Sequence, residues 1–186
     1  MSIMTGQIAD EFRYNGESYD LVGIDGEGFF TPDDFGIKAR AGSTACWRGY
    51  KMTYDCVNGE LLLQEMQVST ASATPINGIE PKAGEYGFSH IYENLRLKTN
   101  FSGKIRLGKD FISSMYVHMG FQSAESFETV IELEIANGNI IKETNLSSLM
   151  KQRREHGLEK PAQPTSMEDS DVRDWISDRF SQNYES

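Results

Sequence analysis

The side chains best suited to bind a ligand or to take part in a reaction lie in two short segments, residues 43–50 and 116–122. The first segment holds Trp47, Arg48 and Tyr50, and the second holds Tyr116 and His118. A guanidinium can bind a carboxylate or a phosphate, and an imidazole can transfer a proton near neutral pH. Such groups could surround a small ligand or support a hydrolytic reaction. They name no particular reaction, because catalytic groups are recognised by their arrangement in space.

Arg48 is expected on an apolar face of a strand over residues 46–56. Alternate residues of a strand share a face, so Arg48 falls beside Tyr50 and Met52. A guanidinium stays charged there and has to find an anion or water. We therefore predict that Arg48 is at least partly buried and bonded either to an internal carboxylate or to a bound anion. The internal candidates are Asp25, Asp33, Asp34 and Asp110.

His118 is a weak candidate for a catalytic acid or base. No Ser or Cys lies at a spacing that indicates a triad. The three His and two Cys of the chain form no zinc motif. The acidic segment over residues 25–34 lacks the alternating ligands of an EF-hand. The sequence therefore predicts no catalytic residue, no metal and no cofactor.

The composition is typical of a globular protein outside the membrane. Hydrophobic residues make up 38% of the 186 residues, and no apolar run reaches the length of a membrane span. The first ten residues lack the basic and apolar regions of a secretory signal. Cys46 and Cys56 would lie about 33 Å apart along one strand, too far for a disulfide. Because free thiols favour a reducing compartment, we expect a cytoplasmic protein.

The chain is acidic, with a net charge of -10 and a pI of about 4.8. This charge argues against nucleic acid as a partner, because phosphate backbones bind basic patches. It agrees with simple solubility and also with a basic protein partner. The rings of Trp47, Tyr50, Tyr54 and Tyr116 could stack on bases, but without a basic groove they are expected in the core or in a protein interface.

Short strands and tight turns make up the expected domain. Asn-Gly pairs at residues 15–16, 58–59, 77–78 and 137–138 indicate turns, since both residues tolerate positive φ. Apolar and polar residues alternate around these pairs, and again over residues 95–107 and 116–121. A short helical turn is expected over residues 109–115. The fold class is therefore mainly β, an antiparallel sandwich or open barrel over residues 11–149.

Charge pairing favours a three-residue turn with a bulged glycine at Gly59 and at Gly138. The pairs that this register predicts are Lys51 with Glu65, Glu132 with Lys142, and Leu133 with Ile141. The buried face of the second hairpin would carry Thr129, Ile131, Leu133 and Ile135. A two-residue turn at either site would contradict this register.

The chain changes character after residue 149. A linker containing proline is expected over residues 150–165, followed by an amphipathic helix over residues 166–181. Its apolar stripe would consist of Val172, Trp175, Ile176 and Phe180. A polar helix of this length is marginal alone, so the stripe has to dock on the β domain or on a partner, with Trp175 as the anchor.

Several motifs occur in an order that resembles a family of small uncharacterised bacterial proteins. They are Ser43-Thr44-Ala45-Cys46-Trp47-Arg48-Gly49-Tyr50, Pro75-Ile76-Asn77-Gly78, Gly103-Lys104-Ile105 with Gly108-Lys109-Asp110-Phe111, and Tyr116-Val117-His118-Met119-Gly120-Phe121-Gln122. The resemblance covers roughly residues 11–146. It implies a single bacterial domain and no particular reaction.

Two functions agree with these observations. The first is a non-enzymatic, acidic protein-binding module of the bacterial cytoplasm, of the immunity or antitoxin type. The second is a small-ligand-binding or hydrolytic domain with a pocket around Arg48, Tyr116 and His118. Convergence of these three side chains on one cavity would favour the second function, and their dispersal would favour the first. The oligomeric state stays open.

Overall fold

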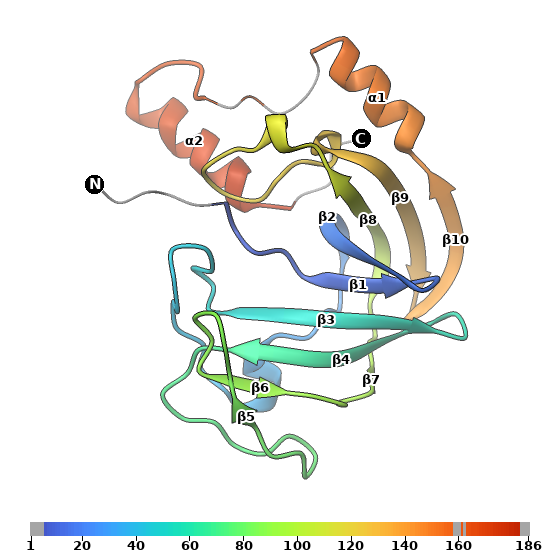
Figure 1. Cartoon of the computed structure of the whole chain (residues 1–186), viewed down its shortest axis with the longest axis vertical. Helices are drawn as coiled ribbons and strands as arrows, with labels where there is room; N and C mark the ends of the chain where they lie inside the picture. The colour runs from blue at the N-terminus through green and yellow to red at the C-terminus, as the bar shows by residue number, and fades with distance from the viewer. Residues whose placement is uncertain (1–5, 158–160, 162, 183–186) are drawn as a thin grey trace.

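The computed structural model describes residues 6–157, 161 and 163–182, and most of them belong to a strand-rich domain (Figure 1). The strands are β1 (Glu11–Tyr14), β2 (Glu17–Glu27), β3 (Tyr50–Val57), β4 (Glu60–Val68), β5 (Lys82–Ala83), β6 (His90–Tyr92), β7 (Leu97–Lys98), β8 (Ser102–Phe111), β9 (Phe127–Ala136) and β10 (Asn139–Asn145). The helices are α1 (Ser147–Glu155) and α2 (Asp169–Phe180), with 3-10 turns η1 (Pro32–Phe35), η2 (Ser113–Met115) and η3 (Ala124–Ser126).

Seven strands form a closed barrel in the order β10-β9-β8-β2-β1-β3-β4, with β4 returning to β10. The mainly β fold class is confirmed. Two details differ from the expectation, because the barrel is closed and β1 pairs with β3 in parallel. Residues 28–49 carry the chain from the end of β2 back to the start of β3, so that β3 enters beside β1 in the same direction (Figure 1).

Two Asn-Gly turns close the barrel. Both residues of each turn have positive φ, with 51° and 77° at Asn58 and Gly59 and 46° and 74° at Asn137 and Gly138. The turns bond to each other's strands, because the Leu61 amide donates to the Gly138 carbonyl at 2.8 Å and the Ile140 amide donates to the Gly59 carbonyl at 2.8 Å. The turns therefore act as a clasp between β4 and β10.

The bulged-glycine turns predicted at these two sites are wrong. Both are two-residue turns, in which Val57 pairs with Glu60 and Ala136 pairs with Asn139. The irregularities lie inside the hairpins instead, between Thr53 and Tyr54 in one and between Ile140 and Lys142 in the other. A bulge bends its strand, and a closed barrel needs bends along the strands more than at the turns.

The predicted charge pairs are also wrong, because they depended on the predicted register of the two hairpins. Lys51 faces Gln67 on β4, and its ammonium lies 3.1 Å from a Glu11 carboxylate oxygen on β1. The Glu132 carboxylate lies 3.5 Å from the Arg106 guanidinium on β8, while Ile141, expected opposite Leu133, is 60% exposed. In both hairpins the charged group finds its partner on a third strand that the hairpin pattern does not include.

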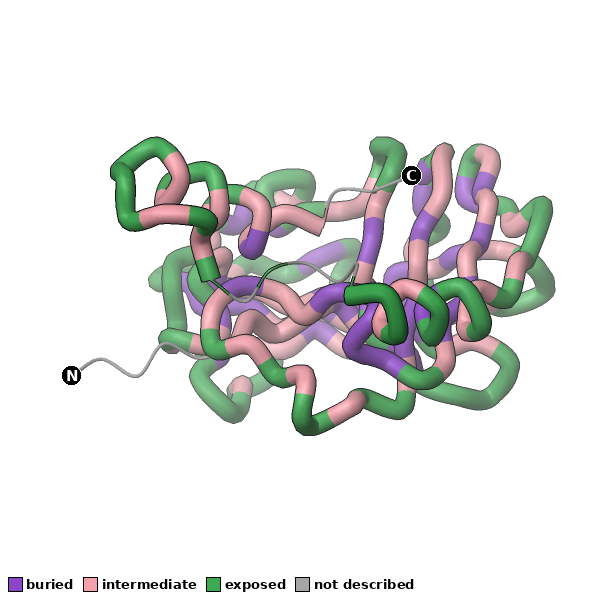
Figure 2. The backbone as a smooth tube through the Cα atoms, turned by 90° about the horizontal axis from the view of Figure 1, so that it is seen from above, coloured by how far each residue is buried: buried purple, intermediate pink, exposed green. Residues whose placement is uncertain are grey.

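The barrel interior is filled by apolar and aromatic side chains. Ile131, Leu133 and Ile135 of β9 are buried as predicted, and Thr129 is partly buried. Phe12 stacks on Tyr54 with centroids 5.0 Å apart, and further rings continue the cluster. Buried and partly buried positions alternate along the strands (Figure 2). This core leaves the ends and the outer surface of the barrel to provide a site.

Helix α1 occupies the beginning of the expected linker over residues 150–165. Met150 of α1 is fully buried in a cluster with Phe127 and Val130. The Arg153 guanidinium pairs with the Glu125 carboxylate at 2.6 Å. The linker expectation is therefore wrong for residues 150–155, because they form a helix whose Met150, Arg153 and Arg154 contact the barrel domain. Residues 158–160 and 162 of that linker lie outside the described residues. Among the described residues, no helix combines the length and the apolar character needed to cross a lipid bilayer.

Candidate functional site

The segment around Trp47 and Arg48 is a turn and not part of a strand over residues 46–56. Cys46 and Ser43 form an isolated bridge, and β3 begins at Tyr50. Gly49 has φ of 79°, and a Cβ at this position would lie 2.1 Å from the Arg40 carbonyl oxygen. Residue 49 therefore has to be a glycine, and its conformation makes β3 begin after it, at Tyr50, so that Arg48 lies outside the strand.

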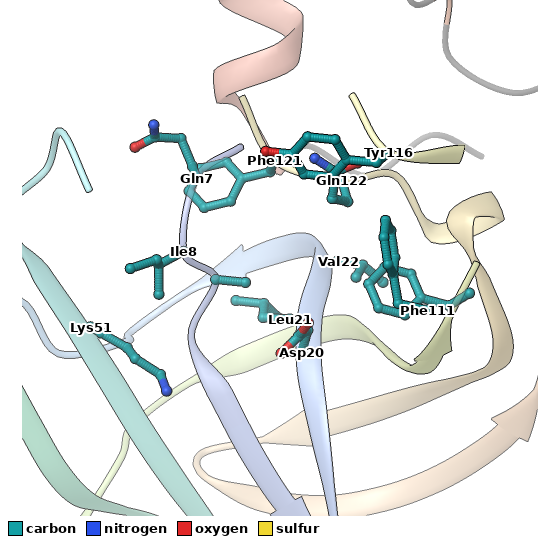
Figure 3. A pocket seen from close by; sticks show the side chains of 12 residues that line it. Gln7, Ile8, Asp20, Leu21, Val22, Lys51, Phe111, Tyr116, Phe121 and Gln122 are labelled. Carbon is teal, nitrogen blue, oxygen red and sulfur yellow. The ribbon is translucent and has the colours of Figure 1, made fainter. Parts of the chain in front are cut away.

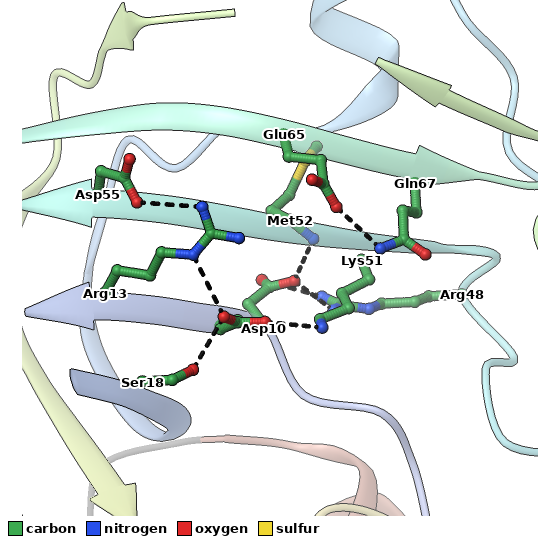
Figure 4. A network of polar contacts seen from close by, with 10 residues as sticks. Asp10, Arg13, Ser18, Arg48, Lys51, Met52, Asp55, Glu65 and Gln67 are labelled. Carbon is green, nitrogen blue, oxygen red and sulfur yellow. Dashed lines mark hydrogen bonds and ion pairs between the residues drawn. The ribbon is translucent and has the colours of Figure 1, made fainter. Parts of the chain in front are cut away.

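Arg48 is partly buried and paired with Asp10, as the sequence analysis predicted for the guanidinium but with another carboxylate (Figure 4). Its Nη2 lies 2.5 Å from Asp10 Oδ1, and that oxygen also accepts the Met52 amide at 2.7 Å. The guanidinium lies over the Tyr50 ring, 4.5 Å from its centroid. Burial lowers the pKa of Arg48, but the Asp10 charge outweighs this and raises it.

The carboxylates proposed as partners of Arg48 lie elsewhere. Asp33 pairs with Lys38, Asp34 accepts the Thr31 amide, Asp110 accepts the Thr129 hydroxyl, and Asp25 lies on β2 opposite Lys104. Asp10 was not among the expected partners and directly precedes β1. It reaches Arg48 because β1 lies beside β3.

A second network lies beside this pair on β1 (Figure 4). Glu11 accepts hydrogen bonds from the Ser18 hydroxyl at 2.8 Å and from the Lys51 ammonium at 3.1 Å. Burial raises the pKa of Glu11, but these two donors outweigh it and lower the pKa. Lys51 is thus held by an internal partner.

Tyr116 and His118 lie in an irregular segment, so the strand expected over residues 116–121 is wrong. The helical turn expected over residues 109–115 is likewise mostly wrong, because β8 continues to Phe111 and only η2 is helical. The Tyr116 hydroxyl accepts the Gly6 amide at 2.8 Å, and the His118 ring meets the Tyr116 ring edge-on with centroids 4.9 Å apart. Gly120 has φ of 74°, which turns the segment back over the barrel. We call residues 116–122 the roof loop.

A pocket of about 330 Å³ lies between the roof loop and the end of the barrel (Figure 3). Its walls come from the N-terminal segment, the start of β2, β3, the end of β8, the roof loop and β9. The lining residues are Gln7, Ile8, Ala9, Asp20, Leu21, Val22, Lys51, Phe111, Tyr116, Phe121, Gln122 and Phe127.

Of the three side chains expected to converge, only Tyr116 lines this pocket. His118 packs against the edge of Tyr116 and is absent from the described lining. Arg48 is also absent from the described lining, and its guanidinium lies 5.9 Å from the centroid of the Phe121 ring. Trp47 and Tyr50 are also outside the described lining, since Trp47 stacks on Phe180 and Tyr50 packs under Arg48. The candidate ligand-binding residues are therefore dispersed.

Aromatic rings form one side of the pocket. Phe111 meets Phe127 with centroids 5.3 Å apart and Tyr116 with centroids 6.4 Å apart. Phe127 reaches its position because Gly108 lies beneath it, where an added Cβ would lie 2.7 Å from the ring. Phe111 and Tyr116 remain 38% and 42% exposed. The pocket thus has an open aromatic rim.

Three of the polar wall residues already have partners. The Gln122 side chain bonds to both the amide and the carbonyl of Val117, at 2.9 Å and 2.7 Å. Gln7 accepts the Trp47 amide at 2.9 Å, and Lys51 is held by Glu11. Asp20 is exposed, and its side chain makes no hydrogen bond or ion pair with a described residue. Partial burial of the carboxyl raises its pKa, which the Lys51 charge lowers and the Glu11 charge raises.

The roof loop is held from two sides. From the N-terminal segment, the Gln7 amide donates to the Gly120 carbonyl at 2.8 Å. From α2, the Arg179 carbonyl accepts the Phe121 amide at 2.7 Å. A Cβ on Gly120 would lie 2.0 Å from that Arg179 oxygen, so only glycine allows this approach. The shape of the pocket therefore depends on both ends of the described chain.

Helix α2 docks on its own domain, and it spans Asp169–Phe180 where residues 166–181 were expected. Phe180 stacks on Trp47 with centroids 4.7 Å apart, while Val172 and Ile176 are partly buried. Trp175 is not the anchor, because its indole N–H donates to the Pro161 carbonyl and the ring stays partly exposed. The buried residue of the helix is Arg179, 1% exposed, whose Nη1 and Nη2 lack a hydrogen-bond partner.

Several pocket residues were missed in the sequence analysis. Asp20, Phe121 and Phe127 belong to segments typical of ordinary strand or loop, Phe111 lies in the helical turn expected over residues 109–115, and Gly108 gave no turn signal. Phe111 and Phe121 do lie inside the motifs that carried the family resemblance. Phe127 and Asp20 carried no such signal. Within residues 6–157, 161 and 163–182, no three His, Cys, Asp or Glu side chains are grouped as a metal site would require.

Comparisons with known proteins assign no function to this site. No protein-family model, no curated protein and no solved structure matches the chain. The resemblance to a bacterial family therefore stays a prediction. The function has to be argued from the pocket and its surroundings.

Proposed function

We propose that this chain is a non-enzymatic, acidic protein-binding module, and that the pocket under the roof loop is its recognition site. The observation that carries the proposal is the open aromatic rim, in which Phe111 and Tyr116 are 38% and 42% exposed beside a preformed pocket. Aromatic side chains around a concave surface are typical anchors of protein interfaces.

The lining supports binding better than catalysis. None of the described lining residues is a Ser, a Cys or a His. Arg48 is occupied by Asp10, and Lys51 is occupied by Glu11. The hydrolytic alternative would need a nucleophile or a base in the pocket, and the described walls supply only Asp20 as an unpaired acid.

The charge favours a basic protein as the partner. A net charge of -10 steers a cationic surface toward the chain during diffusional encounter. Immunity and antitoxin proteins of the bacterial cytoplasm are modules of this kind, and the motif order supports a bacterial source.

A small organic ligand is the second candidate. The pocket volume of about 330 Å³ lies at the lower end of the range for small-molecule sites, about 300–1,000 Å³. The position of the pocket at the end of a barrel also favours this candidate. The two functions predict different results when a rim residue is substituted. A protein-binding module should then no longer capture its partner protein, whereas a small-ligand site has no partner protein to lose.

Phe111→Ser should abolish capture of the partner while leaving the fold intact. Removing an exposed interface anchor is expected to weaken binding by about 2 kcal/mol, or about thirtyfold. The measurement is affinity capture from native lysate with wild type, Phe111→Ser and Ile141→Ser, followed by mass spectrometry. Ile141 is a matched control, because it is 60% exposed on β10 and lies outside the described lining.

The proposal expects basic proteins that wild type and Ile141→Ser retain and Phe111→Ser loses. Melting curves of the three chains check that each is folded. Retention of the same proteins by all three chains would remove the pocket from the interface.

Association with the partner should slow as salt rises. Charges on the two surfaces are screened within roughly 8–10 Å at physiological ionic strength, so steering fades first. We expect the association rate to fall about tenfold or more between 20 mM and 500 mM NaCl, measured by stopped flow. An acidic partner, or a rate that salt does not change, would contradict the role given to the charge.

A further inference from the structure

The described pocket lining holds two charged residues, Lys51 and Asp20, and Asp20 is the exposed one, whose carboxylate has no bonded partner among the described residues. Its neighbour on β1 is Glu11, which is already held by Lys51 and Ser18. Its neighbour on β8 is Gly108, which has no side chain. The strands around Asp20 therefore give its carboxylate no bonded partner among the described residues, and the Lys51 ammonium, which lines the same pocket, is already paired with Glu11 (Figure 3).

We propose that the pocket takes one arginine or lysine side chain of the basic protein partner, and that Asp20 binds its cationic end. This inference rests on the proposed function and names the chemistry that the same site recognises. A side chain of this kind joins an apolar stem to a charged head. The pocket offers apolar walls for the stem and the Asp20 carboxylate for the head.

The apolar walls suit the stem. Ile8, Leu21, Val22 and Phe121 line the pocket together with the aromatic rim. Arginine and lysine bury their methylene groups along such surfaces and keep the charged head at the polar end. The exposed faces of Phe111 and Tyr116 add cation–π attraction for a head that passes between them.

The chain already binds one guanidinium in this way. Arg48 lies over Tyr50 at 4.5 Å, near Phe121 at 5.9 Å, and pairs with Asp10. Phe121 lies near that internal site and also lines the pocket, where aromatic rings and Asp20 repeat the same combination. The internal pair shows that these surroundings accept an arginine.

A protein side chain is favoured over a free amine by the charge of the whole surface. A single cation would use Asp20 alone, whereas a basic protein would also gain from the net charge of -10. The rim is also open, so that the stem of a side chain can enter while its backbone stays outside.

Blocked tripeptides test the inference with the full-length chain. The probes are acetylated and amidated Gly-Xaa-Gly peptides, in which Xaa is arginine or its neutral near-isostere citrulline, together with free agmatine. Amide chemical shifts of the ¹⁵N-labelled chain are followed during titration. We expect the arginine peptide to move the amides of Leu21 and Phe111 with a Kd of about 1–10 mM.

The citrulline peptide should bind about fivefold more weakly, which is the value of a partly exposed ion pair. Asp20→Asn should weaken the arginine peptide by about the same factor and leave the citrulline peptide unchanged. Asp33→Asn is the matched control, because Asp33 lies on η1 and its side chain is 66% exposed. It should change neither titration.

Three outcomes would overturn the inference. Equal binding of arginine and citrulline peptides would leave an apolar recognition pocket without a cation site, so that the proposed function survives. Agmatine binding more than about tenfold tighter than the arginine peptide would make the occupant a small amine. No shift with any probe at about 50 mM would exclude the side chain, while the Phe111→Ser capture would still decide the proposed function.

Discussion

Arg48→Ala should lower the free energy of unfolding by about 2–4 kcal/mol, because it leaves the buried Asp10 carboxylate without its cation. The Asp10 side chain is 9% exposed, and its Oδ1 lies 2.5 Å from the guanidinium. The remaining donor to Asp10 is the Met52 amide, at 2.7 Å. One backbone hydrogen bond does not compensate a buried charge. Urea denaturation, monitored by tryptophan fluorescence, measures the change.

Asp10→Asn tests the reason for this loss. Asparagine keeps a carbonyl oxygen for the Met52 amide and removes the charge that Arg48 neutralises. Combining the two substitutions should therefore cost less than the sum of the single changes, by about 1–3 kcal/mol. Arg13→Ala is the control, since its side chain is 48% exposed and its pairs should contribute less than about 1 kcal/mol. An unchanged melting temperature for Arg48→Ala would refute the structural role of the pair.

Deletion of residues 165–186 should lower the melting temperature by about 5–15 °C, because it removes α2 from its site on the barrel. Phe180 is partly buried, so its ring contributes less than the about 1.5–3 kcal/mol of full burial, and its stacking on Trp47 contributes about 0.5–1.5 kcal/mol. The hydrogen bonds of Gln182 to Leu21 and Ile24 of β2 are lost as well. Burial of the unpaired Arg179 nitrogens offsets part of this stabilisation.

Two further measurements separate docking from a general loss of stability. Trp47→Ala should cost clearly less in the truncated chain than in the full chain, because its partner Phe180 is already gone. The Phe121 amide, which donates to the Arg179 carbonyl, should exchange with solvent faster after truncation. Met167→Ser, at a side chain that is 87% exposed, is the control and should change neither quantity. A truncated chain with an unchanged melting temperature would contradict the docking.

The sequence predicted the local chemistry of the turns and of the strands better than their neighbours. The Asn-Gly pairs indicated turns with positive φ, and the structure has such turns at all four pairs. The alternation of apolar residues in β9 predicted its buried face. The register of both hairpins was wrong, because the charges were paired within each hairpin. The third strand that supplies Glu11 or Arg106 is fixed by the strand order of the barrel, in which β1 lies beside β3 and β8 beside β9.

The candidate site was only partly predictable for the same reason. An arginine among apolar residues requires an anion, so a buried pair at Arg48 followed from the residue types alone. Asp10 lies beside Arg48 because β1 pairs with β3 in parallel, and no local sequence pattern predicts this pairing. Asp20 lacks a cross-strand partner side chain on β8 because Gly108 lies opposite it there. A missing neighbour is a property of the fold, and a single strand does not reveal it.

The clasp formed by the two Asn-Gly turns also determines when the barrel can close during synthesis of the chain. The edge of β4 is completed by the short strands β6 and β7 and, at Glu60, by β10. Because β10 is the last strand, a nascent barrel on the ribosome stays open until the ribosome has passed Asn145. Until then β9 pairs only with β8, and an apolar strand with an unpaired edge promotes association between chains. Slow translation between β4 and β10 would therefore lengthen the period in which this protein depends on chaperones.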